Sequence, residues 1–147
     1  MTYHFKKGCR INADPQIAGI VCEELAANGN LTGKALVDAS RDPEAPLHGA
    51  FNWDDHEAAE LYREDQGRLI IRSLVTVLEE EETPVRAFFN IETRSAEYLP
   101  VRTILTDSDC MDRLYETAVR ELKAFQQKYS QIKKLAAVFA AINELEG

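Results

Sequence analysis

The histidines and carboxylates of residues 48–56 are the part of this chain that comes closest to a catalytic or metal-binding cluster. They are His48, Asp54, Asp55 and His56. Histidine beside carboxylate can transfer protons or hold a metal ion. The two histidines, however, stand eight residues apart across a predicted loop, which matches no standard ligand spacing. We therefore interpret the cluster as the exposed start of a helix and expect neither metal nor cofactor.

The other residues that could do chemistry also lack the necessary spacing. The seven glycines are scattered and form no phosphate-binding loop, and no Gly-x-Ser-x-Gly sequence occurs. Cys9, Cys22 and Cys110 form no Cys-x-x-Cys pair, which argues against a zinc ribbon or a disulfide framework. We expect them to be reduced, with Cys22 a small core residue. The sequence thus predicts a protein that is not an enzyme.

Basic residues offer a different chemistry, contact with the phosphates of nucleic acid. Lys34 and Arg41 fall on the second predicted helix, and Arg94 falls in a predicted hairpin turn. In a helix-turn-helix protein with a wing, such residues clamp or read the duplex. The net charge of −8 opposes this, because affinity for nucleic acid depends largely on neutralising phosphates. Sequence-specific DNA binding is therefore the alternative function, and nonspecific binding is not expected.

The negative charge is concentrated in two segments. Residues 44–66 carry seven acidic side chains against Arg63 alone, and residues 79–82 are all glutamate. Charges of this kind usually form a solvated surface. They could also occupy a basic site on a host protein, as a DNA mimic or an inhibitor would. This second interpretation favours a protein that acts on other proteins.

Capping and turn signals predict three helices in the first half of the chain. The first helix follows Asp14-Pro15 and stops at Asn28-Gly29. A second, shorter helix is capped by Thr32 and ends before Asp42-Pro43. After a loop that contains Trp53, a third helix begins at Asp54 with Glu57 in a capping-box position and fades near Arg72.

Two segments with alternating apolar residues predict an antiparallel hairpin. They run from Val85 to Ile91 and from Leu99 to Leu105, with a turn at 93–96. The expected fold is therefore α+β, with three N-terminal helices, a small antiparallel sheet (a hairpin or a three-stranded meander), and a long C-terminal helix or helix pair. At 147 residues the chain fits a single domain, in which residues 1–106 form the α+β core and residues 107–147 the C-terminal helical region.

This order of elements resembles a winged helix, with Ile17–Arg41 as the helix-turn-helix and the hairpin near Thr93 as the wing. The segment from Leu31 to Leu74, which begins LTGKALVDASRDPEAPLHGAFNW, also resembles small phage and prophage proteins of unassigned function. That resemblance implies a phage origin and assigns no activity. No apolar run reaches the length of about 18 residues that a membrane span needs. We therefore expect a cytoplasmic protein of the bacterial host cell, with no membrane partner.

The C-terminal region repeats an apolar or small residue at alternating steps of four and three, which is typical of a helical seam. The seam residues are Met111, Tyr115, Ala118, Leu122, Phe125, Tyr129, Ile132, Ala136 and Phe139. One long helix would need a second chain to cover this stripe. A break near Tyr129-Ser130 would instead let the second half fold back as a hairpin. We favour a homodimer, because no Gly or Pro marks the break.

The favoured function is therefore that of a non-enzymatic phage-type protein that binds protein partners. Its proposed interface lies on the C-terminal seam, at Tyr115, Leu122, Phe125, Tyr129, Ile132 and Phe139. The partners expected are a second copy of the chain and a host protein. Six residues that point inward in the periodic patterns are predicted to be largely buried: Leu36, Trp53, Tyr62, Phe89, Val101 and Leu122.

Overall fold

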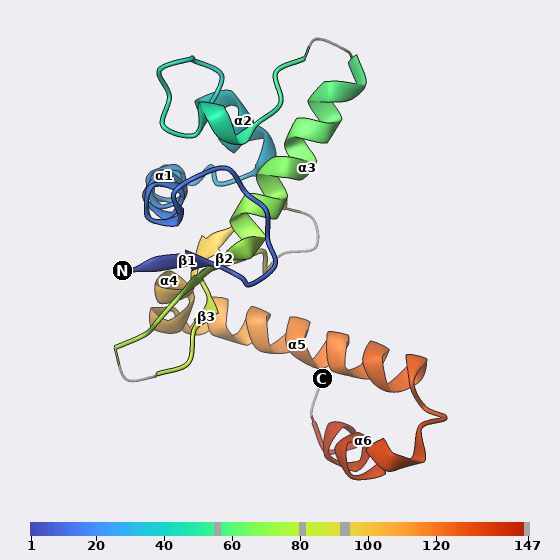
Figure 1. Cartoon of the computed structure of the whole chain (residues 1–147). Helices are drawn as coiled ribbons and strands as arrows, with labels where there is room; N and C mark the ends of the chain where they lie inside the picture. Colours follow the sequence, from blue (N-terminus) through green and yellow to red (C-terminus); the bar gives the residue numbers. More distant parts are fainter. Residues whose placement is uncertain (55–56, 80–81, 92–94, 146–147) are drawn as a thin grey trace. The chain divides into compact units, whose positions relative to one another are not determined.

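The computed structural model describes residues 1–54, 57–79, 82–91 and 95–145, with the backbone alone described at 57 and 58. These residues form helices and small antiparallel sheets joined by loops, which confirms the α+β class (Figure 1). The chain divides into two compact units, Met1–Arg102 and Thr103–Gly147.

Helix α1 spans Pro15–Ala27 and begins and ends where the sequence predicted. The Asp14 carboxylate accepts hydrogen bonds from the backbone N–H groups of Gln16 and Ile17, at 2.8 and 3.0 Å. These donors have no partner within the helix, so the cap satisfies them. Beyond the other end, Gly29 has a φ of 68°, a left-handed conformation that glycine adopts without strain. Local signals were therefore enough to delimit α1.

Helices α2 (Gly33–Ala39) and α3 (Glu57–Ser73) pack against each other through two glycines. The Thr32 side chain caps α2, as predicted. A Cβ atom placed on Gly67 would lie only 2.8 Å from the carbonyl oxygen of Gly33. The lack of a side chain at both positions therefore lets the two backbones come into contact. The predicted capping box of α3 lies in part outside the described residues.

A three-stranded antiparallel sheet joins the N-terminus to the middle of the chain. Its order is β1 (Tyr3–Phe5), β2 (Leu74–Thr76) and β3 (Val85–Arg86). Tyr3 is in register with Thr76. The sequence did not predict β1, because a strand of three residues is too short for an alternating pattern to reveal.

The first predicted strand, Val85–Ile91, is interrupted at Ala87, which separates β3 from β4 (Phe88–Phe89). Buried and exposed residues do not alternate here: Ala87 and Phe88 are both fully buried, while Phe89 is half-buried. The Phe88 ring stacks on that of Tyr3, with centroids 5.8 Å apart. Phe88, and not Phe89 as predicted, is therefore the core residue of this segment.

The second predicted strand, Leu99–Leu105, is mostly helical. Only β5 (Leu99–Pro100) pairs with β4, and the chain then enters helix α4 (Val101–Thr106). Ile104 is fully buried, whereas Leu105 beside it is 47% exposed. The strand prediction is wrong here, because burying one helical face outweighed the preference of Val, Thr and Ile for strands.

The core of the first unit draws on β1, α1, α2, α3, β2 and β4, together with residues of the connecting loops. Its members include Tyr3, Ala18, Cys22, Leu31, Leu36, Val37, Leu47, Ile70, Ile71, Leu74 and Phe88. The predicted burial of Leu36 and Val101 is confirmed, and Trp53 is half-buried. Tyr62 is 56% exposed, so its predicted burial is wrong. Helix α3 buries Ile70 and Ile71, whereas Tyr62, eight residues earlier, is exposed to solvent.

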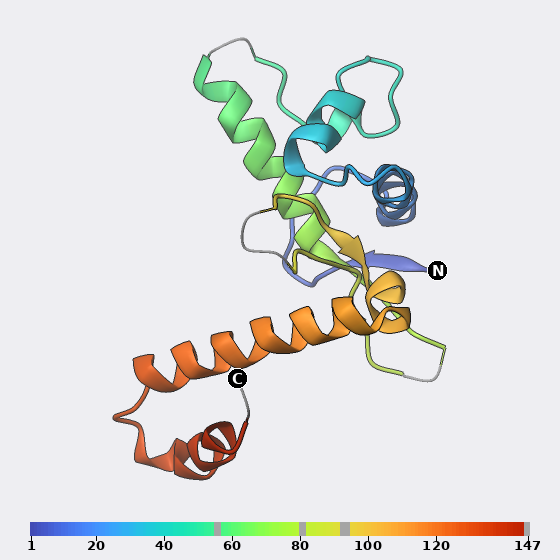
Figure 2. The same cartoon turned by 180° about the vertical axis from the view of Figure 1, so that it is seen from behind.

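The second unit is a helical hairpin and not one continuous helix. It contains α5 (Ser108–Lys128), a 3-10 turn (Lys133–Leu135) and α6 (Ala136–Asn143). Helix α6 lies beside the second half of α5 (Figure 1 and Figure 2). The chain leaves α5 at Tyr129 and Ser130, where the sequence placed the alternative break. The expectation that a break there needs Gly or Pro was wrong.

A side-chain cap marks the start of α5. The cap is Asp107, whose carboxylate accepts a hydrogen bond from the backbone N–H of Cys110 at 3.0 Å. This hydrogen bond holds the pKa of the Asp107 carboxyl below its usual range. The charged carboxylate is also favoured by the dipole at the start of the helix.

Candidate functional site

Trp53 lies at the centre of a cluster that attaches the loop of residues 41–53 to α3. The His48 ring stacks on the indole, with centroids 4.9 Å apart and planes inclined by 4°. The indole Nε1 donates a hydrogen bond to the carbonyl oxygen of His48 at 2.7 Å, and His48 Nδ1 lies 2.9 Å from the carbonyl oxygen of Ser40. His48 therefore belongs to a half-buried 3-10 turn (His48–Ala50) that holds the loop, and not to an exposed helix start as predicted.

Arg63 of α3 completes this cluster and is buried, with 6% of its surface exposed. Its guanidinium donates hydrogen bonds to the carbonyl oxygens of Asn52 and Asp54, at 2.6 and 2.9 Å, and to the Glu60 carboxylate at 3.1 Å. It also lies 5.0 Å from the centroid of the Trp53 ring. The sequence analysis did not assign Arg63 a role. Its one signal was that it is the sole basic residue in an acidic segment.

The basic residues proposed to contact DNA are engaged with carboxylates. Lys34 Nζ lies 2.8 Å from Asp38 Oδ2, and Arg41 Nε lies 2.9 Å from Asp38 Oδ1. Arg41 also pairs with Glu60. These hydrogen bonds raise the pKa of Lys34 and lower that of Asp38. A phosphate would have to compete with both carboxylates, which weakens the case for a DNA-binding face. The third proposed residue, Arg94, lies outside the described residues.

No three His, Cys, Asp or Glu side chains among the described residues are grouped so that they could hold a metal ion, and Asp55 and His56 are not described. A pocket of about 320 Å³ on α5 is lined by Glu116, Val119, Arg120 and Lys123, none of which is a nucleophile beside a base. None of the described helices combines the length and apolar character that a membrane span requires.

The three cysteines are free thiols. Cys22 is fully buried in the core, which confirms its predicted role, and burial raises its pKa to about 12. It is therefore a neutral thiol at physiological pH, unsuited to act as a nucleophile. The Sγ atom of Cys9 lies 3.4 Å from Ser73 Oγ. Cys9 and Cys110 are both half-buried.

Aromatic packing and one amide hydrogen bond hold the C-terminal hairpin together. Phe125 of α5 contacts Tyr129, with ring centroids 4.9 Å apart, and Phe139 of α6 at 6.4 Å. Gln126 Nε2 donates a hydrogen bond to Asn143 Oδ1 at 3.0 Å. Each helix also has one buried aliphatic residue, Val119 in α5 and Ile142 in α6. Asn143, which breaks the apolar pattern of the sequence, thus ties α6 to α5.

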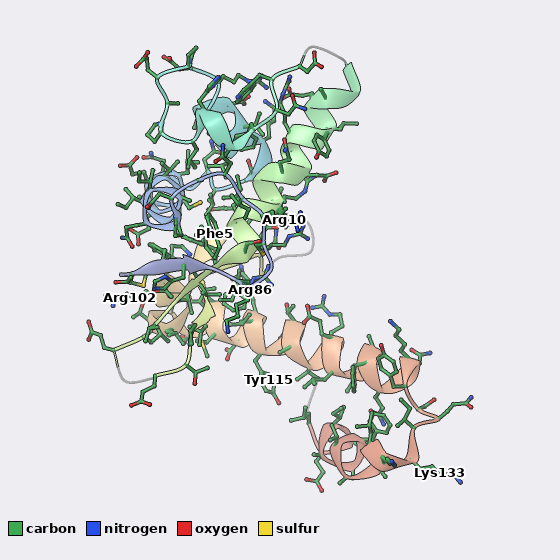
Figure 3. All side chains as sticks on the ribbon, in the orientation of Figure 1. Phe5, Arg10, Arg86, Arg102, Tyr115 and Lys133 are labelled. Carbon is green, nitrogen blue, oxygen red and sulfur yellow. The ribbon has the colours of Figure 1, made fainter. Side chains whose placement is uncertain are left out.

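Much of the predicted interface remains exposed to solvent. The hairpin face, as we call it, comprises six large apolar residues that are 37% to 48% exposed: Met111, Tyr115, Leu122, Phe125, Ile132 and Val138. Leu122 is 39% exposed, so its predicted burial is wrong for the single chain, while Tyr129 and Phe139 are half-buried. Tyr115 projects from the first half of α5, beyond the part that α6 lies beside (Figure 3). Five of the six belong to the apolar seam of the sequence, Val138 being the exception. Exposed apolar surface that is contiguous usually marks an interaction site.

Comparison with known proteins does not reveal a relative. No family model matches the chain, and neither the curated proteins nor the solved structures include a significant match.

Proposed function

We propose that this protein is non-enzymatic and acts by binding other proteins through the hairpin face. The observation that supports this is the exposure of six large apolar side chains on α5, on α6 and in the connection between them. Covering such a surface is favourable because it removes apolar area from water. The partners proposed are a second copy of the chain and a protein of the host.

The charge distribution supports different roles for the two units. Residues 1–102 carry 18 acidic and 11 basic side chains, a net charge of −7, whereas residues 103–147 carry 7 and 6, a net charge of −1. The acidic first unit suits a partner with a basic surface, such as a nucleic-acid-binding protein that it would inhibit by competing with nucleic acid. The resemblance of residues 31–74 to phage proteins supports the bacterial cytoplasm as the place of action.

Affinity capture from bacterial lysate, with and without nuclease, tests this proposal. The wild type is compared with a variant that carries Tyr115→Gln and Leu122→Gln. Glutamine is polar and a good helix former, so both changes should preserve α5. Leu61→Gln on α3 is the matched control, because Leu61 is a 68% exposed leucine outside the hairpin face. We expect a protein partner that survives nuclease, is lost in the double variant and is retained by the control.

The same experiment separates protein binding from sequence-specific DNA binding, the alternative supported by the order of α1, α2 and the short strands. Partners recovered only before nuclease treatment would favour that alternative. Random duplex DNA should not bind at physiological ionic strength, because few basic residues are available to neutralise phosphates. Unchanged binding by the double variant would contradict the proposal.

A further inference from the structure

The charged residues of the second unit are segregated along the hairpin. The acidic end, residues 107–116, contains Asp107, Asp109, Asp112 and Glu116 against Arg113, a net charge of −3. The basic end, residues 120–128, contains Arg120, Lys123 and Lys128 against Glu121, a net charge of +2, and Lys133 and Lys134 follow beyond the end of α5. Lys133 lies in the turn at the far end of α5 (Figure 3). The unit itself carries only −1 of the chain's net charge of −8, so this unit adds little to the repulsion between two copies.

From this polarity we infer that a second copy of the chain covers the hairpin face, with the two α5 helices antiparallel. An antiparallel pair places the acidic end of each copy beside the basic end of the other, at both ends of the contact. A parallel pair would place like charges together at both ends. The inference rests on the proposed function, since it names the occupant of the same surface.

The apolar residues of α5 fit this arrangement. Met111, Tyr115, Ala118, Leu122 and Phe125 follow each other at steps of four and three, the spacing of a coiled-coil seam. Ala118 is exposed and lies at the middle of this run. A small residue at the centre lets two helices approach closely around a twofold axis, as an isologous dimer requires.

The position of α6 explains why a second α5 is needed. Within the unit, α6 lies beside the second half of α5, where Phe125 meets Phe139 (Figure 1 and Figure 2). Tyr115, in the first half, projects beyond the part of α5 that α6 lies beside (Figure 3). An antiparallel partner helix brings the second half of its own seam to this first half, and the twofold axis repeats the contact. Two hairpins thus form a four-helix assembly.

Sedimentation equilibrium of the full chain tests whether the hairpin face mediates self-association. We expect a dimer whose dissociation constant rises at least about tenfold in the Tyr115→Gln/Leu122→Gln variant and stays unchanged in Leu61→Gln. Circular dichroism should show that helix content is retained. A wild type that stays monomeric at high concentration, or a double variant that dimerises as well as the wild type, would overturn the inference.

Charge reversal tests the antiparallel orientation. Asp109→Lys/Asp112→Lys changes the acidic end from −3 to +1, and Lys123→Glu/Lys128→Glu changes the basic end from +2 to −2, at side chains that are exposed in the single chain. Each pair of changes alone should weaken dimerisation at low salt, because like charges then meet at both ends. All four changes together should restore it. The quadruple variant should also fail to pair with the wild type, since their facing ends carry the same sign.

A parallel dimer gives the opposite result when the quadruple variant is mixed with the wild type. The quadruple variant would then pair with the wild type in preference to itself, and the inference would be wrong. Raising the salt concentration should reduce these differences by screening the charges. A further outcome is possible: the wild type is monomeric and captures a host protein that the Tyr115→Gln/Leu122→Gln variant does not capture. In that case the self-association is wrong while the proposed function stands.

Discussion

Gly33 and Gly67 allow α2 and α3 to pack backbone against backbone. A Cβ atom on Gly67 would lie 2.8 Å from the carbonyl oxygen of Gly33, and a Cβ atom on Gly33 would lie 2.9 Å from the carbonyl oxygen of Glu64. Backbone atoms cannot move aside as a flexible side chain can. The glycine inside α3, which costs helix propensity, is therefore explained by a close contact between helices.

Replacing Gly67 by alanine should destabilise the protein. Alanine gains about 1 kcal/mol in helix propensity, but overpacking at a backbone contact costs about 1–3 kcal/mol, so we expect a net loss in the free energy of unfolding. Urea denaturation measures this loss. Gly49→Ala is the control, because a Cβ atom there would meet nothing within 4 Å. A Gly67→Ala variant more stable than the wild type would show that the helices do not touch here.

Phe88→Ala should cost about 3–5 kcal/mol of stability, because the ring is fully buried and its removal leaves a cavity beside Tyr3. Phe89→Ala should cost clearly less, since Phe89 is half-buried. Thermal or urea unfolding of the two variants gives the comparison. A larger loss for Phe89→Ala would mean that the strand has the alternation predicted from the sequence.

Arg63→Lys should lower the free energy of unfolding by about 2 kcal/mol, because a single ammonium group cannot replace the fork of donors that serves Asn52, Asp54 and Glu60. Trp53 is the sole tryptophan of the chain, so its fluorescence emission should change when the loop that contains it is displaced. The exposed Arg72→Lys serves as the control. An unchanged emission spectrum in Arg63→Lys would contradict the anchoring role.

Cys22 should not react with a thiol reagent at pH 8 in the native protein, while Cys9 and Cys110 react; denaturation should expose all three. Because burial raises the pKa of Cys22 to about 12, the unfolded state releases the thiol proton at lower pH than the folded state. Its contribution to stability is therefore full below about pH 8.5 and declines as the pH rises toward 12. A Cys22→Ala variant should lose this alkaline dependence. Rapid modification of Cys22 in the folded state would show that its surroundings are open.

Local signals in the sequence were sufficient to predict where several helices begin or end. Asp14 and Thr32 cap their helices as predicted, and α1 ends before Gly29. The polar stretch around Ser130 marks the end of α5. Each of these depends on contacts between residues close in the chain, and such contacts can be read from spacing and residue type.

Which face of an element is buried was decided by the tertiary structure. Phe88 and not Phe89 belongs to the core, because Tyr3 of the distant strand β1 supplies the ring against which Phe88 packs. Tyr62 is exposed, and residues 101–106 form a helix that buries Ile104. The same holds for Arg63, whose donors find partners only after the loop folds onto α3. The sequence alone determined that a C-terminal apolar stripe exists. Only the hairpin geometry, in which α6 lies beside half of α5, determined which of its residues remain exposed.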